Sequence, residues 1–192
     1  MTKHLQDMTL EELWQLFPIE LVEHQAAWTV QYECMREHMA AALEQADIQQ
    51  VRIHHIGSTT VPGIMAKPIV DMLVEVADEQ QLTAVQTVLE QMDMLTMYAD
   101  QTHIDLNYGY TEQGFADQVF HVHVRCAGDH DELYFRDYLL DHADVAKQYE
   151  QLKIALWHRF EHNRDAYTNA KTAFVRSTTA VAKQAYGPRY EQ

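Results

Sequence analysis

The sequence predicts an α/β (α+β) fold, a mixed β-sheet flanked by helices with further helices at the C-terminal end. Residues 69–76 alternate in the manner of a strand with one fully apolar face. Residues 78–92, and most of the chain after residue 131, repeat apolar side chains at helical spacing. An order in which strands alternate with helices and then give way to helices is typical of such a layered fold.

The first fifty residues are predicted to be helical. Thr9-Leu10-Glu11-Glu12 fits a capping box that opens a short helix through Leu16, and Pro18 ends it. A longer helix is expected from about Pro18 or Glu23 to Gln45. It carries a stripe at three- and four-residue steps that we expect in the core, namely Trp28, Tyr32, Met35, Met39 and Leu43.

Two strands and the loop between them form the centre of the prediction. Residues 51–56 are expected to be a strand, and Gly57 to Gly63 interrupt regular structure. In the strand at 69–76, one face is apolar and must pack on helices, whereas Asp71 lies on the other. A carboxylate on an inner strand is costly unless it is paired, hydrogen-bonded or bound to a metal, which makes Asp71 a candidate functional residue.

The second half supplies a hairpin and then helices only. A helix over 78–92, capped by Asp78, precedes strands at 104–110 and 119–125 that turn through Gly114. His121, His123 and Arg125 share one face of the later strand. Helices are expected at 131–141, 145–160 and 163–186, the last capped by Asn163.

Composition limits the classes of function. The chain has 14 lysines and arginines against 29 acids, a formal charge of −15, which disfavours general nucleic-acid binding but not one small nucleotide. No apolar stretch is typical of a signal peptide or membrane span, and the two cysteines, both expected to be buried, lie in no CxxC motif. We therefore expect a cytoplasmic protein without a membrane partner.

The segment from His55 to Asp71 has the residue types of a phosphate site. After a strand, a Gly57-Ser58 turn lets backbone N–H groups approach a phosphate, and the Ser58 hydroxyl adds a donor. The following strand brings up Asp71, and a carboxylate beside such a turn is what Mg²⁺ needs to bridge protein and triphosphate oxygens. The turn can also be a purely structural one that needs small residues.

This pattern resembles the nucleotidyltransferase signature, and the surrounding sequence resembles the GrpB family within that superfamily. The segments that carry the resemblance are HIGSTTVPG, AKPIVDMLV, GFADQVFHVHVR, ELYFRDYL and NRDAYTNAKTAFV, between about Ile19 and Val181. It implies a nucleotidyltransferase-like domain over 19–186 with a helical extension over 1–18. It also implies a catalytic, metal-binding Asp71, Mg²⁺ or Mn²⁺ as cofactor, a nucleoside triphosphate substrate and a small-molecule acceptor.

One departure from the signature matters for chemistry. Leu73 stands where active members carry a second acid, and Glu75 is about 7 Å from Asp71 by strand rise. The comparable later strand offers His121 and His123, and two imidazoles with one carboxylate suit a transition metal such as Zn²⁺. Further candidates for phosphate or substrate contact, each equally readable as a solvated or ion-paired side chain, are Lys67, Arg125, Arg136 and Lys171.

Three functions remain open from sequence alone. The chain is a metal-dependent nucleotidyltransferase, a non-catalytic module that binds a nucleotide or metabolite, or a metal-dependent hydrolase that uses Asp71, His121 and His123. A small nucleotide or metabolite is the expected partner in each case, and a homodimer is compatible with the sequence. Fold alone does not decide among them.

Overall fold

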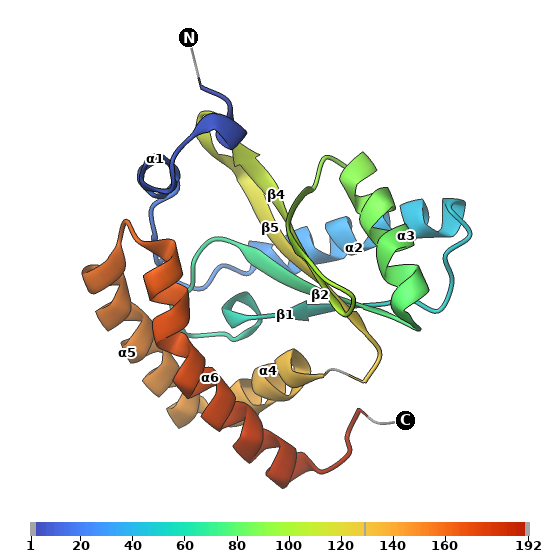
Figure 1. The fold of residues 1–192 in the computed structure, drawn as a ribbon. Helices are drawn as coiled ribbons and strands as arrows, with labels where there is room; N and C mark the ends of the chain where they lie inside the picture. The colour runs from blue at the N-terminus through green and yellow to red at the C-terminus, as the bar shows by residue number, and fades with distance from the viewer. Residues whose placement is uncertain (1–2, 129, 191–192) are drawn as a thin grey trace.

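Five strands form one mixed sheet in the computed structural model, which describes residues 3–128 and 130–190 (Figure 1). The strand order is β1-β2-β5-β4-β3; β2 and β5 run parallel, and the other neighbours are antiparallel. The predicted mixed α/β architecture is confirmed. The strands are β1 (Arg52–Ile56), β2 (Val70–Val76), β3 (Leu95–Ala99), β4 (His103–Thr111) and β5 (Gly114–Cys126).

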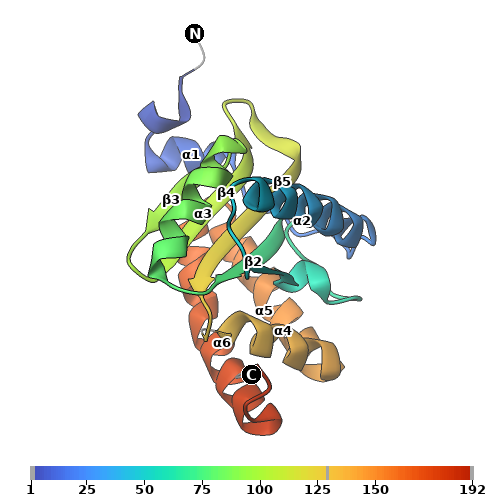
Figure 2. The same ribbon diagram turned by 90° about the vertical axis from the view of Figure 1, so that its right-hand side faces the viewer.

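Helices cover both faces of this sheet. On one face lie α2 and α3, and on the other lie the three C-terminal helices (Figure 1). Figure 2 shows the short N-terminal helix α1 near β3 and β4. The helices are α1 (Leu10–Leu16), α2 (Ala27–Gln45), α3 (Glu79–Gln91), α4 (Asp131–Asp141), α5 (Ala143–Phe160) and α6 (Arg164–Tyr186).

The apolar face of β2 forms the main core, as its alternation predicts. Val70, Met72, Val74 and Val76 are all at most 1% exposed and belong to one cluster with side chains of α2 and α3. The predicted stripe of α2 joins the same core, with Met35 partly buried beside it. The opposite face of β2 is thereby turned toward α4, α5 and α6.

Several local signals in the sequence form the expected caps and turns. Thr9 and Glu12 make the complete capping box, Asp78 caps α3, and the Asn163 side chain accepts from the Ala166 N–H. The hairpin between β4 and β5 turns at Gly114, whose φ is +109°.

One expected helix start is wrong, and one strand was missed. The long helix begins at Ala27, because residues before it bond to distant backbone instead: Ile19 to Glu161 at 2.8 Å, and Val22 with Ala66 at 2.9 and 3.0 Å. The edge strand β3 was not predicted, because it is mostly exposed and pairs only with β4, so its sequence lacks strand alternation.

Four smaller expectations have different outcomes. Cys34 is exposed and Cys126 only partly buried, so the expectation of two buried cysteines is wrong. Across residues 3–128 and 130–190, none of the helices combines the length and apolar character needed to span a bilayer. The boundary at residue 18 and the cytoplasmic location stay predictions.

Candidate functional site

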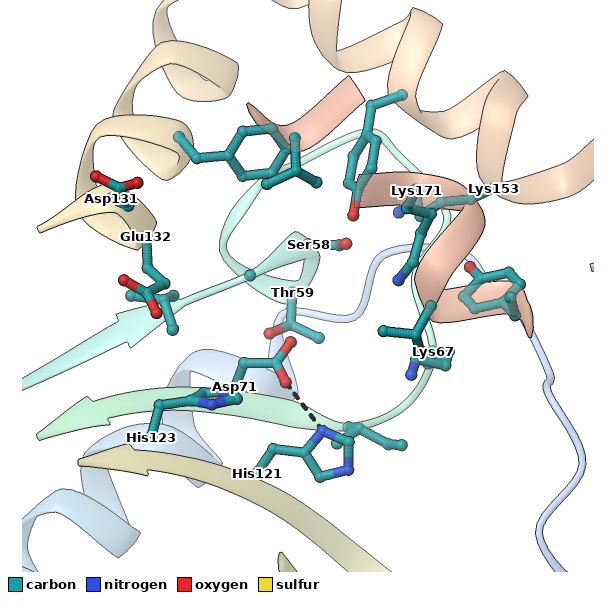
Figure 3. Close-up of a pocket in the computed structure, with 18 of the residues that line it drawn as sticks. Ser58, Thr59, Lys67, Asp71, His121, His123, Asp131, Glu132, Lys153 and Lys171 are labelled. Carbon is teal, nitrogen blue, oxygen red and sulfur yellow. Dashed lines mark ion pairs between the residues drawn. The ribbon is translucent and has the colours of Figure 1, made fainter. Parts of the chain in front are cut away.

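A cavity of about 480 Å³ lies between the sheet face that carries Asp71 and the three C-terminal helices (Figure 3). Its floor comes from the end of β1, the start of β2, the second half of β5 and the turn after β1, and its wall comes from α4, α5 and α6. The side chains and turn residues that carry its chemistry are Gly57, Ser58, Lys67, Asp71, His121, His123, Asp131, Glu132, Tyr149, Lys153, Arg164, Tyr167, Lys171 and Arg176.

Asp71 lies at the centre of this floor because of strand register. Asp71 pairs with Ile56 of β1 on one side and with His121 of β5 on the other. Its Oδ1 is 3.3 Å from Nδ1 of His121, and its side chain is 29% exposed. The predicted juxtaposition of Asp71 and His121 therefore exists.

The turn after β1 fits closely against Asp71. Gly57 has a φ of +73°, a conformation that other residues rarely adopt, and a Cβ at this position would lie 2.3 Å from Asp71 Oδ2. Glycine is therefore required here both by backbone conformation and by space. Ser58 follows at the start of a short 3₁₀ turn and also lines the cavity.

Asp71 and His121 form an ionised acid beside a neutral imidazole. Burial opposes ionisation of Asp71, but the contact with His121 and the nearby His123 and Lys67 outweigh it and lower its pKa to about 2. Burial lowers the pKa of His121 to about 4 against the attraction of Asp71. The neutral ring fits a network in which Nδ1–H points to Asp71 and Nε2 accepts from Tyr110, 2.8 Å away.

The cavity concentrates positive charge in a strongly acidic chain. Five of the chain's 14 lysines and arginines line it: Lys67, Lys153, Arg164, Lys171 and Arg176. Burial and mutual repulsion lower the lysine pKa values, to about 7 for Lys153, to about 8 for Lys171 and well below the usual value for Lys67. Such crowding of cations stores repulsion that a bound anion would relieve.

A buried hydroxyl without a partner among the described residues belongs to a ring that contacts two of these cations. Tyr167 is 1% exposed, and its buried hydroxyl has no hydrogen-bond partner in the part of the chain that the structure describes. The ring contacts Lys171 and Lys67, whose Nζ atoms are 4.5 and 5.7 Å from its centroid. A buried polar group without a partner is rare in folded proteins and marks a place where a ligand atom would be favourable.

The opposite end of the cavity is acidic. Figure 3 shows Asp131 and Glu132 across the cavity from Lys153 and Lys171, with Asp71 between the two groups. Glu132 lines the cavity and lies 3.7 Å from the Arg125 guanidinium. The cavity is therefore polarised, with a cationic end and an acidic end.

The predicted metal ligands are only partly assembled. His123 lines the cavity, but its Nδ1 lies 2.9 Å from Asp105 of β4, and this contact and Asp71 raise its pKa despite burial. Within residues 3–128 and 130–190, no group of three or more His, Cys, Asp or Glu side chains is arranged to hold a metal ion. The side chains present do not fit a metal held by protein ligands alone.

The remaining predicted residues fall into two groups. Gly57, Ser58, Lys67 and Lys171 lie at the cavity with Asp71. Arg125 and Arg136 do not line it. Arg125 is buried and bonds to Asp105 and to the backbone of Ile104 and Val124, and Arg136 bonds to Asp137, Tyr190 and the His55 carbonyl.

Sequence reasoning missed part of the cationic wall. Lys153 lies within the apolar stripe of α5, four residues after Tyr149 and three before Leu156, and a lysine on a buried face is a signal of a polar site. On α6, Arg164 and Tyr167 precede Lys171 by seven and four residues, so the three share one helix face. The helical periodicity of these segments can be read from the sequence, but the sequence does not show which face of each helix packs against the sheet.

Comparison with known proteins identifies the family. The model of the family described as GrpB protein matches residues 18–180. UPF0157 protein YqkA of Bacillus subtilis is 29% identical over 181 residues, 91% of this chain, and the chain spans about half of that relative's length, 51%. The crystal structure of the conserved protein GrpB from Enterococcus faecalis aligns with a TM-score of 0.73 and 27% identity over 87% of this chain and 99% of that one.

More distant structures share the fold. In the GLD-2/RNP-8 complex, one chain aligns with a TM-score of 0.54 and 11% identity over 96% of this chain and 73% of that one. A structure of Cid1, described with an RNA terminal uridylyl transferase activity, aligns with a TM-score of 0.50 and 11% identity over 78% of this chain and 44% of that one. The chain belongs to the GrpB family and has a nucleotidyltransferase-like fold.

Proposed function

We propose that the cavity binds a nucleoside triphosphate or another small phosphorylated molecule, with the phosphates against Lys67, Lys153 and Lys171. The observation that carries this proposal is the gathering of five of the chain's 14 cationic residues around one cavity in a chain of net charge −15. A solvated surface would distribute these charges, whereas phosphate binding requires them to converge.

Two further features support a phosphate ligand. The Gly57-Ser58 turn borders the same cavity, so backbone N–H groups and the serine hydroxyl are close to the cationic wall. The Tyr167 hydroxyl, which has no hydrogen-bond partner among the described residues, adds a neutral donor on a ring that Lys67 and Lys171 contact. A phosphate oxygen would accept from such donors and offset the repulsion among the lysines.

A divalent metal, if it takes part, would enter with the ligand. Asp71 is the ionised carboxylate on the sheet floor, and Mg²⁺ or Mn²⁺ is commonly held by one carboxylate, phosphate oxygens and water. A Zn²⁺ ion on Asp71, His121 and His123 would instead require His121 to release a ring nitrogen, because its Nδ1 faces Asp71 and its Nε2 accepts from Tyr110. We therefore expect binding of the phosphates to persist without metal and to strengthen with Mg²⁺ or Mn²⁺.

Nucleotidyl transfer to a small acceptor is the second candidate. The observation that favours it is the Asp105–His123 pair, because Asp105 holds Nδ1 while no described residue hydrogen-bonds Nε2 of this cavity-lining ring. A histidine oriented in this way can accept a proton from an acceptor hydroxyl. Metal-dependent hydrolysis by Asp71, His121 and His123 stays a prediction.

Calorimetric titration with inorganic tripolyphosphate and with ATP tests the binding proposal. Lys171→Met is expected to lower the affinity for both ligands about tenfold or more, because a charge-assisted hydrogen bond contributes about 1.5–3 kcal/mol. Arg159→Met is the matched control, since this exposed cation lies near the end of α5 and does not line the cavity. Equal losses in the two variants, or no binding to wild type at millimolar ligand, would refute the proposal.

Transfer requires a separate assay. Wild type, Asp71→Asn and His123→Gln would be incubated with α-phosphate-labelled ATP, Mg²⁺ or Mn²⁺, and a panel of small hydroxyl and amine acceptors. Transfer by wild type that is lost in Asp71→Asn and follows a displaced pH profile in His123→Gln supports catalysis. ATP binding without labelled product would leave the non-catalytic binding module as the function.

A further inference from the structure

We infer that a second, larger cavity beside the first takes the apolar portion of the same phosphorylated ligand, so that the substrate class is an elongated amphipathic phosphate ester or anhydride. This inference rests on the proposed phosphate site. The second cavity has a volume of about 1050 Å³ and lies between α1, the segment before it, and the edge of the sheet formed by β3 and β4.

The lining of the second cavity is largely apolar. From α1 come Leu10, Leu13 and Trp14, and from β3 come Leu95 and Met97. Three of these side chains are unusually exposed for their type: Leu10 is 56%, Leu95 46% and Met97 62% exposed. Clustered exposed apolar side chains around a hollow are typical of a binding site and not of a surface that merely contacts water.

Helix α1 covers this hollow instead of packing into the core. None of its residues is buried, although its capping box shows that the helix is specifically formed. Phe17, directly after the helix, is 3% exposed and packs against Tyr110 with ring centroids 4.7 Å apart. The helix is thus held at its C-terminal end, while Leu10, Leu13 and Trp14 border space that an apolar group can fill.

The two cavities are continuous on one face of the sheet. His121, Arg164 and Thr168 line both of them. Paired residues run in a single row from Asp71 through His121 and Asn107 to Leu95. Because neighbouring strands are about 4.8 Å apart, this row spans roughly 14 Å, the reach of a diphosphate with a medium-length chain.

Tyr110 lies at the junction of the two cavities. Its hydroxyl donates to His121 Nε2 at 2.8 Å and accepts from Arg164 at 2.9 Å, and burial raises its pKa to about 12. This bonding links Arg164 of the cationic wall to the Asp71–His121 pair, and His121 and Arg164 both line the two cavities. Lysines line the first cavity, whereas leucines and a methionine line the second. This change in lining favours a ligand with one anionic end and one apolar end.

A homologous series of alkyl diphosphates tests this inference. Calorimetric titration of ethyl, butyl, hexyl and octyl diphosphate, below their critical micelle concentrations, is expected to show affinity rising about three- to fourfold for each added methylene that becomes buried. Inorganic tripolyphosphate is the reference that occupies only the cationic cavity.

Substitutions of exposed residues test whether the second cavity causes the dependence of affinity on chain length, and they leave the buried core unchanged. Leu10→Glu and Met97→Glu are expected to abolish the gain with chain length while leaving tripolyphosphate affinity unchanged. Leu140→Glu is the matched control, because Leu140 is 46% exposed on α4 and lines neither cavity. This control should retain the full chain-length dependence.

The outcomes separate the two proposals. Tripolyphosphate binding with equal affinity for ethyl and octyl diphosphate would overturn the apolar subsite and leave the phosphate site intact. Failure of tripolyphosphate and every diphosphate to bind would overturn both. A concentration-dependent dimer in sedimentation that Met97→Glu dissociates, without any chain-length dependence, would overturn the subsite and assign the apolar surface to a second copy of the chain.

Discussion

At the scale of single residues, Gly57 and Asp71 depend on each other. The positive φ of Gly57 turns the chain so that its backbone lies directly against the Asp71 carboxyl, leaving no room for a Cβ. Asp71 in turn lies beside His121, which is bonded to Tyr110. The position of the ionised acid is therefore determined by a glycine fourteen residues earlier as well as by the strand that carries it.

Replacement of this glycine should cost more than replacement of another glycine with a similar positive φ. Gly57→Ala is expected to lower the free energy of unfolding by roughly 2–5 kcal/mol, since left-handed strain of about 1–2 kcal/mol adds to an overpacking cost of about 1–3 kcal/mol. Gly63 has a similar positive φ of +77°, but no atom lies within 4 Å of a Cβ added there, so Gly63→Ala tests a positive φ without the steric clash. Urea denaturation of both variants measures the difference, and equal losses would contradict a steric role for Asp71.

The lowered lysine pKa values predict a pH dependence of anion binding. Sulfate keeps one charge state across the relevant range, so its affinity should fall about tenfold between pH 6.5 and 9 as Lys153 and Lys171 lose their protons. In the ligand-free protein the same lowered pKa values have the opposite effect on stability. The folded lysines lose their protons at a lower pH than the unfolded ones, so the free energy of unfolding should rise from about pH 7 toward the lysine pKa of the unfolded chain. Titration with sulfate at several pH values checks this, and a flat profile for wild type would exclude charged lysines as the anion site.

At the scale of elements, α1 and α3 have equally well-formed N-caps but different places in the molecule. The capping box of Thr9 starts a helix with no buried residue, whereas Asp78 starts a helix whose Leu82, Val85 and Leu89 lie in the main core. A local signal in the sequence thus forms the helix in both cases, but only packing makes α3 part of the cooperative fold.

Removal of each cap should separate local from global stability. Asp78→Ala is expected to lower the free energy of unfolding by about 1 kcal/mol, the usual effect of losing an N-cap. Thr9→Ala should change global stability by less than about 0.5 kcal/mol while increasing hydrogen exchange of α1 amides, because the helix opens without the core. Exchange followed by mass spectrometry, together with urea denaturation, measures both. A global loss in Thr9→Ala equal to that in Asp78→Ala would show that α1 unfolds with the core.

At the scale of the whole molecule, charge is distributed unevenly. The net charge is −15, yet one internal cavity holds five cations. The acidic exterior repels polyanions such as nucleic acids, whereas the cavity attracts a small anion that can enter it. The predicted absence of general nucleic-acid binding and the proposed phosphate site are therefore compatible.

Salt should act in opposite directions on stability and on binding. Raising KCl from about 20 to 300 mM is expected to raise the melting temperature of the ligand-free protein by a few degrees, because ions screen the repulsion among excess acids. The same increase in KCl should lower the affinity for tripolyphosphate severalfold, because the ions screen the cavity cations. Thermal unfolding and calorimetry measure the two effects, and a melting temperature that falls with salt would contradict the role given to net charge.

The sequence by itself determined the fold class, most of the elements and several residues that line the cavity. Alternation in residues 69–76 identified the core face of β2 and left Asp71 on the other face, and caps at Thr9, Asp78 and Asn163 placed three helix starts correctly. These signals are local, because each depends on the spacing of side chains within one element. The GrpB resemblance was likewise carried by short continuous segments and is confirmed.

Only the tertiary structure decided which side chains meet. It brought Lys153 and Arg164 to Asp71, turned Arg125 toward Asp105, and held His123 by the same acid. It also recruited residues before Ala27 and the edge strand β3 through backbone bonds to distant segments, which no local pattern encodes. The physical reason is that strand register and helix-to-sheet packing join residues far apart in the chain, so cavity, charge and pKa are properties of the assembled fold.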